Sequence, residues 1–134
     1  MEVKKRAQII TDWINNYCDS VSYRPKTLVV GISGGIDSSV VSTLCANTGR
    51  KTIVLTMPIK QIKSQHDLSL LHAQWLKQKY KNVEHHLIEM DKIFSSFSTV
   101  LNKFDPRLNI TPAFVNKLSK DPEVALLLST KDTK

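Results

Sequence analysis

Two kinds of hydrophobic pattern alternate along the chain. Apolar residues with helical spacing predict helices over residues 2–20, 37–48, 65–80 and 92–102. Continuous runs of β-branched and apolar residues predict strands over residues 27–32, 52–57 and 83–89. Strands that alternate with helices indicate a parallel sheet joined by right-handed crossovers. We therefore expect an α/β, Rossmann-like fold of three layers, with helices on both faces of the sheet.

The helical stripes also predict which side chains are buried. The stripe of the first helix consists of Val3, Ala7, Ile10, Ile14 and Tyr17, widened by Ile9 and Trp13. We expect this stripe to pack on the domain, and a role as an interface is the alternative. In the helix over 65–80, the residues expected in the core are Leu68, Leu71, Trp75 and Leu76.

Polar residues predict where two of the helices begin. Ser64 followed by Asp67 resembles a capping box, with Asp in the place of Glu. Asp91 is expected to cap the helix over 92–102.

The character of the chain changes after residue 104. Thr111-Pro112 and Asp121-Pro122 each combine an N-cap residue with a proline at the first helical position. They predict short helices over 112–119 and 122–129. We therefore expect a first domain over residues 1–104 and a divergent helical tail over residues 105–134.

Charge and composition restrict the partners of the chain. Nineteen Lys and Arg residues against 12 Asp and Glu give a net charge of +7. Only Lys4-Lys5-Arg6 form a cluster, and no RNA-binding signature interleaves the basic residues with aromatic ones, which argues against a nucleic-acid partner. No apolar run has the length of a membrane span, and the start MEVKKRAQII lacks the apolar core of a signal peptide. We expect a cytoplasmic protein without a membrane partner.

The cysteines and histidines argue against a metal centre built from them. Cys18 and Cys45 have no metal-binding spacing, and both are expected to be buried as small apolar residues. His85 and His86 are adjacent in a predicted strand, so their side chains point to opposite faces.

The stretch with the clearest chemistry is Leu28–Ser39, LVVGISGGIDSS. A predicted strand runs into a glycine-rich turn, and the turn opens into a predicted helix. The first N–H groups of a helix lack intrahelical partners and carry the positive end of its dipole, so they bind phosphate groups. The pattern is not Walker A, because no lysine follows the glycines. The alternative is a plain β–α turn in which Asp37 or Ser38 caps the helix.

The hexapeptide Ser33–Ser38, SGGIDS, resembles the SGGxDS pyrophosphate loop of the ATP pyrophosphatases. Three longer stretches resemble ammonia-dependent NAD synthetase: VVGISGGIDSSVVSTLCANTG, LTMPIKQ, and the segment from SQHD to KIFSSF. This resemblance implies a fold like that of the adenine nucleotide alpha hydrolases. It covers about the first 104 residues. The chain does not match the longer family after Phe104, so the sheet is expected to be incomplete with an open edge.

The resemblance also implies a reaction and a site. The family adenylates the carboxylate of deamido-NAD with ATP and then amidates it with ammonia, and it needs no protein nucleophile. A homodimer is also implied. The ATP-binding residues carried over are Gly31, Ile32, Ser33, Gly34, Gly35, Ile36, Asp37, Ser38, Thr56 and Met57. Asp37 matches the Mg²⁺ ligand, and the hydroxyls of Ser33 and Ser38 are expected to donate to phosphate as well.

Two other functions remain open from the sequence. One is a truncated nucleotide-binding module without full catalysis. The other is a fragment of a tRNA-modifying ATP pyrophosphatase, which the basic charge suits.

Overall fold

The computed structural model describes residues 1–59 and 63–104. The chain divides into two compact units, Met1–Glu89 and Met90–Lys134, and each is described by itself. In the second unit, the described element is the helix α4 (Asp91–Phe104), which has no buried residue. The predicted boundary near residue 104 and the helices predicted over 112–119 and 122–129 lie outside the described residues.

All seven elements predicted before residue 104 are present, with ends that differ by one or two residues. In the first unit they are α1 (Val3–Ser20), β1 (Thr27–Gly31), α2 (Ile36–Asn47), β2 (Lys51–Thr56), α3 (Lys63–Lys79) and β3 (Val83–Leu87). Two predicted caps are wrong, because Ser64 lies inside α3 and Asp91 is the first residue of α4. Within residues 1–59 and 63–104, no helix is long and apolar enough to cross a membrane.

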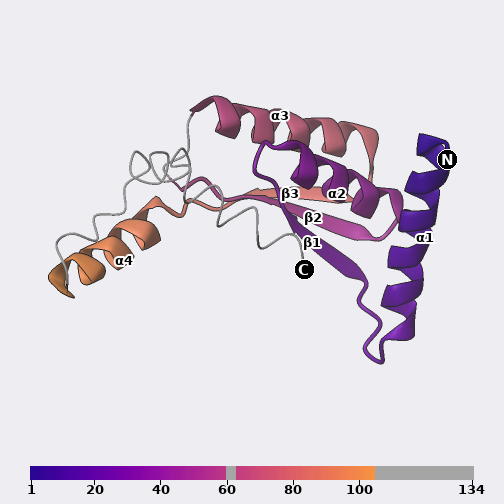
Figure 1. Cartoon of the computed structure of the whole chain (residues 1–134), viewed down its shortest axis with the longest axis horizontal. Coiled ribbons are helices and arrows are strands. Elements are labelled where there is room, and N and C mark those ends of the chain that lie inside the picture. Colours follow the sequence, from indigo (N-terminus) through magenta and orange to yellow (C-terminus); the bar gives the residue numbers. More distant parts are fainter. Residues whose placement is uncertain (60–62, 105–134) are drawn as a thin grey trace. The chain divides into compact units, whose positions relative to one another are not determined.

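The three strands form one parallel sheet in the order β1-β2-β3. Val29 pairs with Ile53, and Ile53 pairs with Glu84. Two right-handed crossovers that proceed in the same direction place their helices on the same face. Accordingly, α2 and α3 lie side by side over one face, and α1 packs against α2 (Figure 1).

The predicted α/β, Rossmann-like fold with an incomplete parallel sheet is therefore confirmed. Of the helix layers expected on both faces, the described residues of the first unit form one. On the opposite face Val29 is 61% exposed.

Small side chains bring α3 close to the sheet. The core consists of Ile32, Ala46, Val54, Ala73, Leu76 and Val83, with Tyr80 packed against it. On α3 the buried residues are Ser69, Ala73 and Leu76, and the Ser69 hydroxyl donates to the carbonyl of His66 at 2.6 Å.

The prediction that the other large apolar residues of α3 are buried is wrong. Leu68, Leu71 and Trp75 are 53%, 62% and 42% exposed. Because α3 contacts the sheet through its small residues, these larger side chains lie on the side that faces away from the sheet.

The predicted apolar stripe of α1 is also only partly buried. Thr11 and Cys18 are buried, and Ala7 and Ile14 are partly buried. The exposed apolar residues of this helix are Val3, Ile9, Ile10, Trp13 and Tyr17. The packing expected of the whole stripe is thus wrong for its larger part, and the alternative of an interface remains open.

Cys18 and Cys45 are buried and free, as predicted, and burial together with the nearby Cys18 raises the pKa of Cys45.

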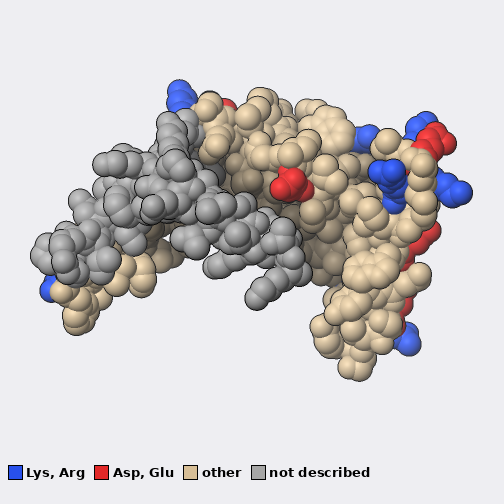
Figure 2. Space-filling view, viewed as in Figure 1, with Lys and Arg blue, Asp and Glu red and all other residues tan. Residues whose placement is uncertain are grey.

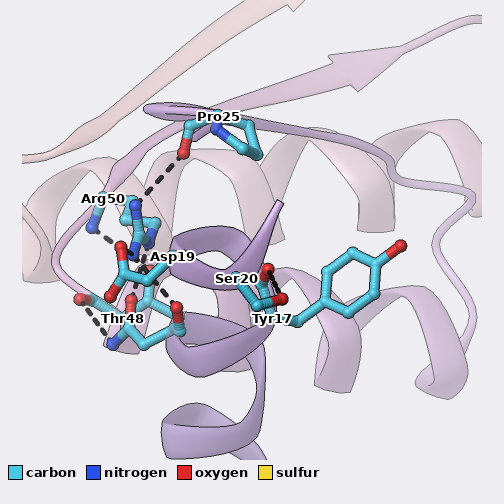
Figure 3. Close-up of polar contacts among 7 residues, drawn as sticks. Tyr17, Asp19, Ser20, Pro25, Thr48 and Arg50 are labelled. Carbon is cyan, nitrogen blue, oxygen red and sulfur yellow. Dashed lines mark hydrogen bonds and ion pairs between the residues drawn. The ribbon is translucent and has the colours of Figure 1, made fainter. Parts of the chain in front are cut away.

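Arg50 ties the end of α1 to the turn between α2 and β2 (Figure 3). Its Nε donates to Asn15 Oδ1 at 2.7 Å, and its terminal nitrogens donate to the carbonyls of Pro25 and Asn15 and to Asp19 Oδ1. The planar guanidinium reaches all these acceptors at once because its donors form a rigid fork. Arg50 therefore sets the position of α1 on the domain.

Replacement of Arg50 by Met removes four side-chain hydrogen bonds, three of them to partly buried acceptors. We expect the free energy of unfolding to fall by about 2–4 kcal/mol, since each bond contributes about 0.5–1.5 kcal/mol. The exposed Asp19 carboxylate adds little to this sum. Urea denaturation measures the change.

Two further variants test the role of the fork. Arg50→Lys keeps the charge but not the fork, and it should recover only part of the loss. Arg6→Met removes an exposed cation from α1 and should cost less than about 0.5 kcal/mol. Equal losses for Arg50→Met and Arg6→Met would contradict this assignment.

Candidate functional site

The glycine-rich turn lies at the carboxyl end of β1, where the chain leaves the sheet. The last bond to β2 is donated by the N–H of Ile32 to the carbonyl of Leu55 at 2.8 Å. Ile32 is buried, whereas Ser33, Gly35 and Asp37 are exposed. The bend therefore presents its backbone at the surface, at the sheet edge where open α/β proteins bind ligands.

Gly34 is the residue that fixes the direction of the bend. Its φ is +91°, a conformation that residues with a Cβ rarely adopt. A Cβ at this position would also collide with the main-chain carbonyl oxygen of Gln65, in the first turn of α3. Glycine thus allows the turn to lie directly on α3.

Two serines hold the bend from inside. The N–H of Ser33 donates to Ser38 Oγ at 3.1 Å, and the N–H of Gly35 donates to Ser33 Oγ at 3.2 Å. The two hydroxyl oxygens are 3.1 Å apart. Both hydroxyls, expected from the sequence to donate to phosphate, are therefore engaged within the loop. No local signal in the sequence predicts this pairing across five residues.

Four amides of the turn and of α2 have no partner among the described residues: those of Gly34, Ile36, Asp37 and Ser38. The N-cap of α2 is Gly35, and no side chain caps the helix. The alternative in which Asp37 or Ser38 caps α2 is therefore not what the structure has. Unpaired amides at the positive end of a helix dipole form an anion-binding site.

Asp37 lies in the first turn of α2, next to these amides. Its carboxylate is exposed and makes no hydrogen bond or ion pair with a described residue. No group of three His, Cys, Asp or Glu side chains converges in residues 1–59 and 63–104. Mg²⁺ commonly takes one or two carboxylates and completes its shell with phosphate oxygens and water. A single exposed Asp beside a phosphate site fits that mode.

Thr56 and Met57 occupy different positions relative to the bend. Thr56 is 1% exposed, its hydroxyl lies 2.9 Å from His85 Nε2, and its carbonyl accepts from the N–H of Ile88. The side chain of Thr56 is therefore beneath the surface. Met57 is 41% exposed, and its Cε lies 3.3 Å from the point where Gly31 would carry a Cβ. Met57 thus borders the turn, next to Gly31.

His85 lies beside Thr56, a contact that the sequence pattern did not predict. Burial lowers the pKa of its imidazole, and the nearby Lys77 lowers it further. His86 lies 3.5 Å from Glu84. The prediction that the two histidines point to opposite faces is confirmed. His85 contacts Thr56 on the helix-covered face of the sheet. His86 lies beside Glu84, which is on the other face because it is one residue from His85 in β3.

The chain matches the family model described as NAD synthase over residues 6–115. It is 31% identical over 98 residues to the NH(3)-dependent NAD(+) synthetase of Staphylothermus marinus, an alignment that covers 72% of this chain. It is 38% identical over 85 residues to the NH(3)-dependent NAD(+) synthetase of Finegoldia magna, covering 63% of this chain. Each alignment spans 34% of the relative's length.

Two solved structures have a similar fold. NH3-dependent NAD synthetase from Campylobacter jejuni aligns with a TM-score of 0.63 and 26% identity, over all of this chain and 54% of the other. NMN synthetase from Francisella tularensis aligns with a TM-score of 0.67 and 24% identity, over 89% of this chain and 45% of the other. The match of the family model to most of the chain shows that this protein belongs to the NAD synthase family.

Proposed function

We propose that this chain takes part in ATP-dependent amide formation of the NAD synthetase type, with deamido-NAD, ATP and ammonia as substrates. The observation that carries the proposal is the exposed glycine bend, where four amides at the start of α2 lack partners among the described residues, beside the Asp37 carboxylate. Membership of the NAD synthase family supports it.

The reaction consists of two displacements. A carboxylate oxygen of deamido-NAD attacks the α-phosphorus of ATP, and the bond to the bridging oxygen breaks, so that pyrophosphate leaves. Ammonia then attacks the acyl carbon, AMP leaves, and a proton is lost. Both nucleophiles come from substrates, so the chain has to position them and to stabilise charge on the leaving pyrophosphate.

In this proposal the bend receives the β and γ phosphates of ATP. The amides of Gly34, Ile36, Asp37 and Ser38 donate to phosphate oxygens, while Ser33 and Ser38 keep the bend in shape through their hydroxyls. Asp37 holds Mg²⁺, which neutralises charge on the polyphosphate when bound. Met57 borders the position of the adenosine, and Thr56 contributes from below by supporting the end of β2.

The remaining expectations belong to the same proposal. The chain acts as a homodimer in the cytoplasm, without nucleic acid. The chain spans about a third of the length of the relatives named above.

Asp37→Asn should weaken binding of Mg-ATP by at least about tenfold, equivalent to about 1.4 kcal/mol, because the neutral amide is a poor Mg²⁺ ligand. Circular dichroism should be unchanged, since Asp37 is exposed. Asp12→Asn changes the charge equally on α1 and should bind like the parent chain. Isothermal titration with Mg-ATP measures both, and unchanged affinity in Asp37→Asn would exclude this metal site.

Gly34→Ala should abolish nucleotide binding, because the methyl group displaces the bend from Gln65. Gly49→Ala is the matched control, since Gly49 also has a positive φ of +77° but has no atom within 4 Å of the point where a Cβ would lie. Both variants should lose roughly 1 kcal/mol or more of stability from backbone strain. Only Gly34→Ala should lose affinity for ATP, and equal affinities would show that the shape of the bend is irrelevant to binding.

The activity itself is tested by release of AMP from ATP. AMP and NAD should form in equal amounts when deamido-NAD, ammonium and Mg²⁺ are all present. Omission of ammonium should stop NAD formation, and at ATP concentrations below its dissociation constant the Asp37→Asn chain should form both products at least about tenfold more slowly. Nucleotide binding without AMP release would favour the nucleotide-binding module over the ligase.

A further inference from the structure

Two buried thiols lie where the end of α1 meets the end of α2. Cys18 is 3% exposed and Cys45 is 8% exposed, and both are free. They belong to different helices, so it is the fold that brings them together. The glycine bend lies at the opposite end of α2, and the proposed reaction uses neither thiol.

Hydrogen bonds place the two cysteines on either side of one contact between the helices. Asn15 Nδ2 donates to the carbonyl of Thr48 at 3.3 Å. Cys18 lies one turn after Asn15. Cys45 lies one turn before Thr48, whose hydroxyl donates to the carbonyl of Cys45 at 2.6 Å. Residues three positions apart are neighbours on a helix surface, so both cysteines adjoin this contact.

The burial of the two side chains has a common origin. Of the described elements, α2 makes the main contact with α1. The buried residues of α2 are Ser42, Cys45 and Ala46. Ser42 contacts His72 of α3, and Ala46 belongs to the core over the sheet. This leaves Cys45 as the buried residue of α2 that faces α1. In agreement, burial raises the pKa of Cys45 and the nearby Cys18 raises it further.

The spacing of packed helices suits a disulfide between facing residues. Helix axes in contact lie about 8–10 Å apart, and each Cα lies about 2.3 Å from its axis. At the wider of these spacings, facing Cα atoms are about 5 Å apart. A disulfide joins Cα atoms that are about 4.4–6.8 Å apart. Cys18 and Cys45 can therefore be joined while α1 stays on α2.

We propose that Cys18 and Cys45 are a redox-active thiol pair, which hydrogen peroxide oxidises to a disulfide between α1 and α2. The sulfur of one thiolate attacks a peroxide oxygen, the O–O bond breaks, and hydroxide leaves, so that a sulfenic acid forms. The second sulfur attacks the first, the S–O bond breaks, and a second hydroxide leaves. The two thiol protons convert both hydroxides to water. The thiols lose two electrons, and the peroxide gains them.

The end of α1 controls access to the pair. Cys18 lies in the last turn of α1, and helix ends open more readily than helix centres. The raised pKa of Cys45 leaves little of it as thiolate, so Cys18 is expected to react first. Opening of that turn requires Asn15 and Asp19 to leave Arg50 (Figure 3). The hydrogen bonds of Arg50 therefore limit the rate at which peroxide reaches the thiols.

Treatment of the folded full chain with hydrogen peroxide, followed by alkylation and measurement of the intact mass, tests the proposal. The chain should lose the mass of two hydrogen atoms and take up no alkyl group, and dithiothreitol should restore both thiols. Peptide mapping should find Cys18 joined to Cys45. The melting temperature should rise by at least about 5 °C, because the cross-link restricts the unfolded chain.

Four variants serve as controls. Cys18→Ala and Cys45→Ala each leave one thiol, and each should gain oxygen atoms instead of losing hydrogen. Arg50→Met should form the disulfide at least about tenfold faster, because a contribution of about 1.4 kcal/mol to opening is a factor of ten. Arg6→Met should react at the rate of the parent chain. Circular dichroism identifies any loss of fold.

Three results would overturn the proposal. They are addition of oxygen to the two thiols separately, disulfides between chains, and no reaction of the folded chain at a peroxide concentration that oxidises the chain in urea. Equal rates for Arg50→Met and Arg6→Met would overturn the assigned route of access. Figure 2 shows the face on which α1 and α2 are viewed, and the test concerns this part of the molecule alone. Its outcome does not depend on nucleotide binding, because the glycine bend lies at the other end of α2.

Discussion

The absence of a side chain at Gly34 is the constraint on which the candidate site depends. With a φ of +91° and the carbonyl of Gln65 directly against it, the bend can reverse after β1 while it touches α3. The amides of Ile36, Asp37 and Ser38, which follow the bend, have no partner among the described residues. The two serine hydroxyls then hold the bend open without using those amides. The proposed anion site is therefore main chain in origin, and Asp37 is the side chain proposed to add charge to it.

The scaffold under the site is built from small and hydroxyl-bearing residues. Ser42, Ser69 and Ala73 bring α2 and α3 close to the sheet, and each hydroxyl bonds a carbonyl of its own helix. This close approach leaves the larger apolar residues outside. The same packing thus explains both the support of the bend and the exposure of Leu68, Leu71 and Trp75 on α3.

Arg50 attaches α1 to the domain near the end of α2. It joins the end of α1 to the α2–β2 turn through side-chain and main-chain acceptors that lie 25 to 35 residues away in the sequence. The polar side of α1 is held by this contact, and the aromatic pair Trp13 and Tyr17 remains stacked at the surface, 5.4 Å between ring centroids. The apolar surface of the first unit is therefore a consequence of how its helices are attached.

Sequence alone determined the order and type of the elements, because the periods of helix and strand are local properties of the chain. It also determined the family and the position of the bend, since Ser33–Ser38 carries a specific arrangement of glycine, serine and aspartate. Only the tertiary structure decided that Leu76 is buried while Leu71 is exposed, and that the Thr56 hydroxyl meets His85. Residues of one stripe are alike in the sequence, and their burial depends on how closely a neighbouring element approaches. In the same way, which amides of the bend lack a partner among the described residues depends on which hydroxyls the folded loop brings within reach.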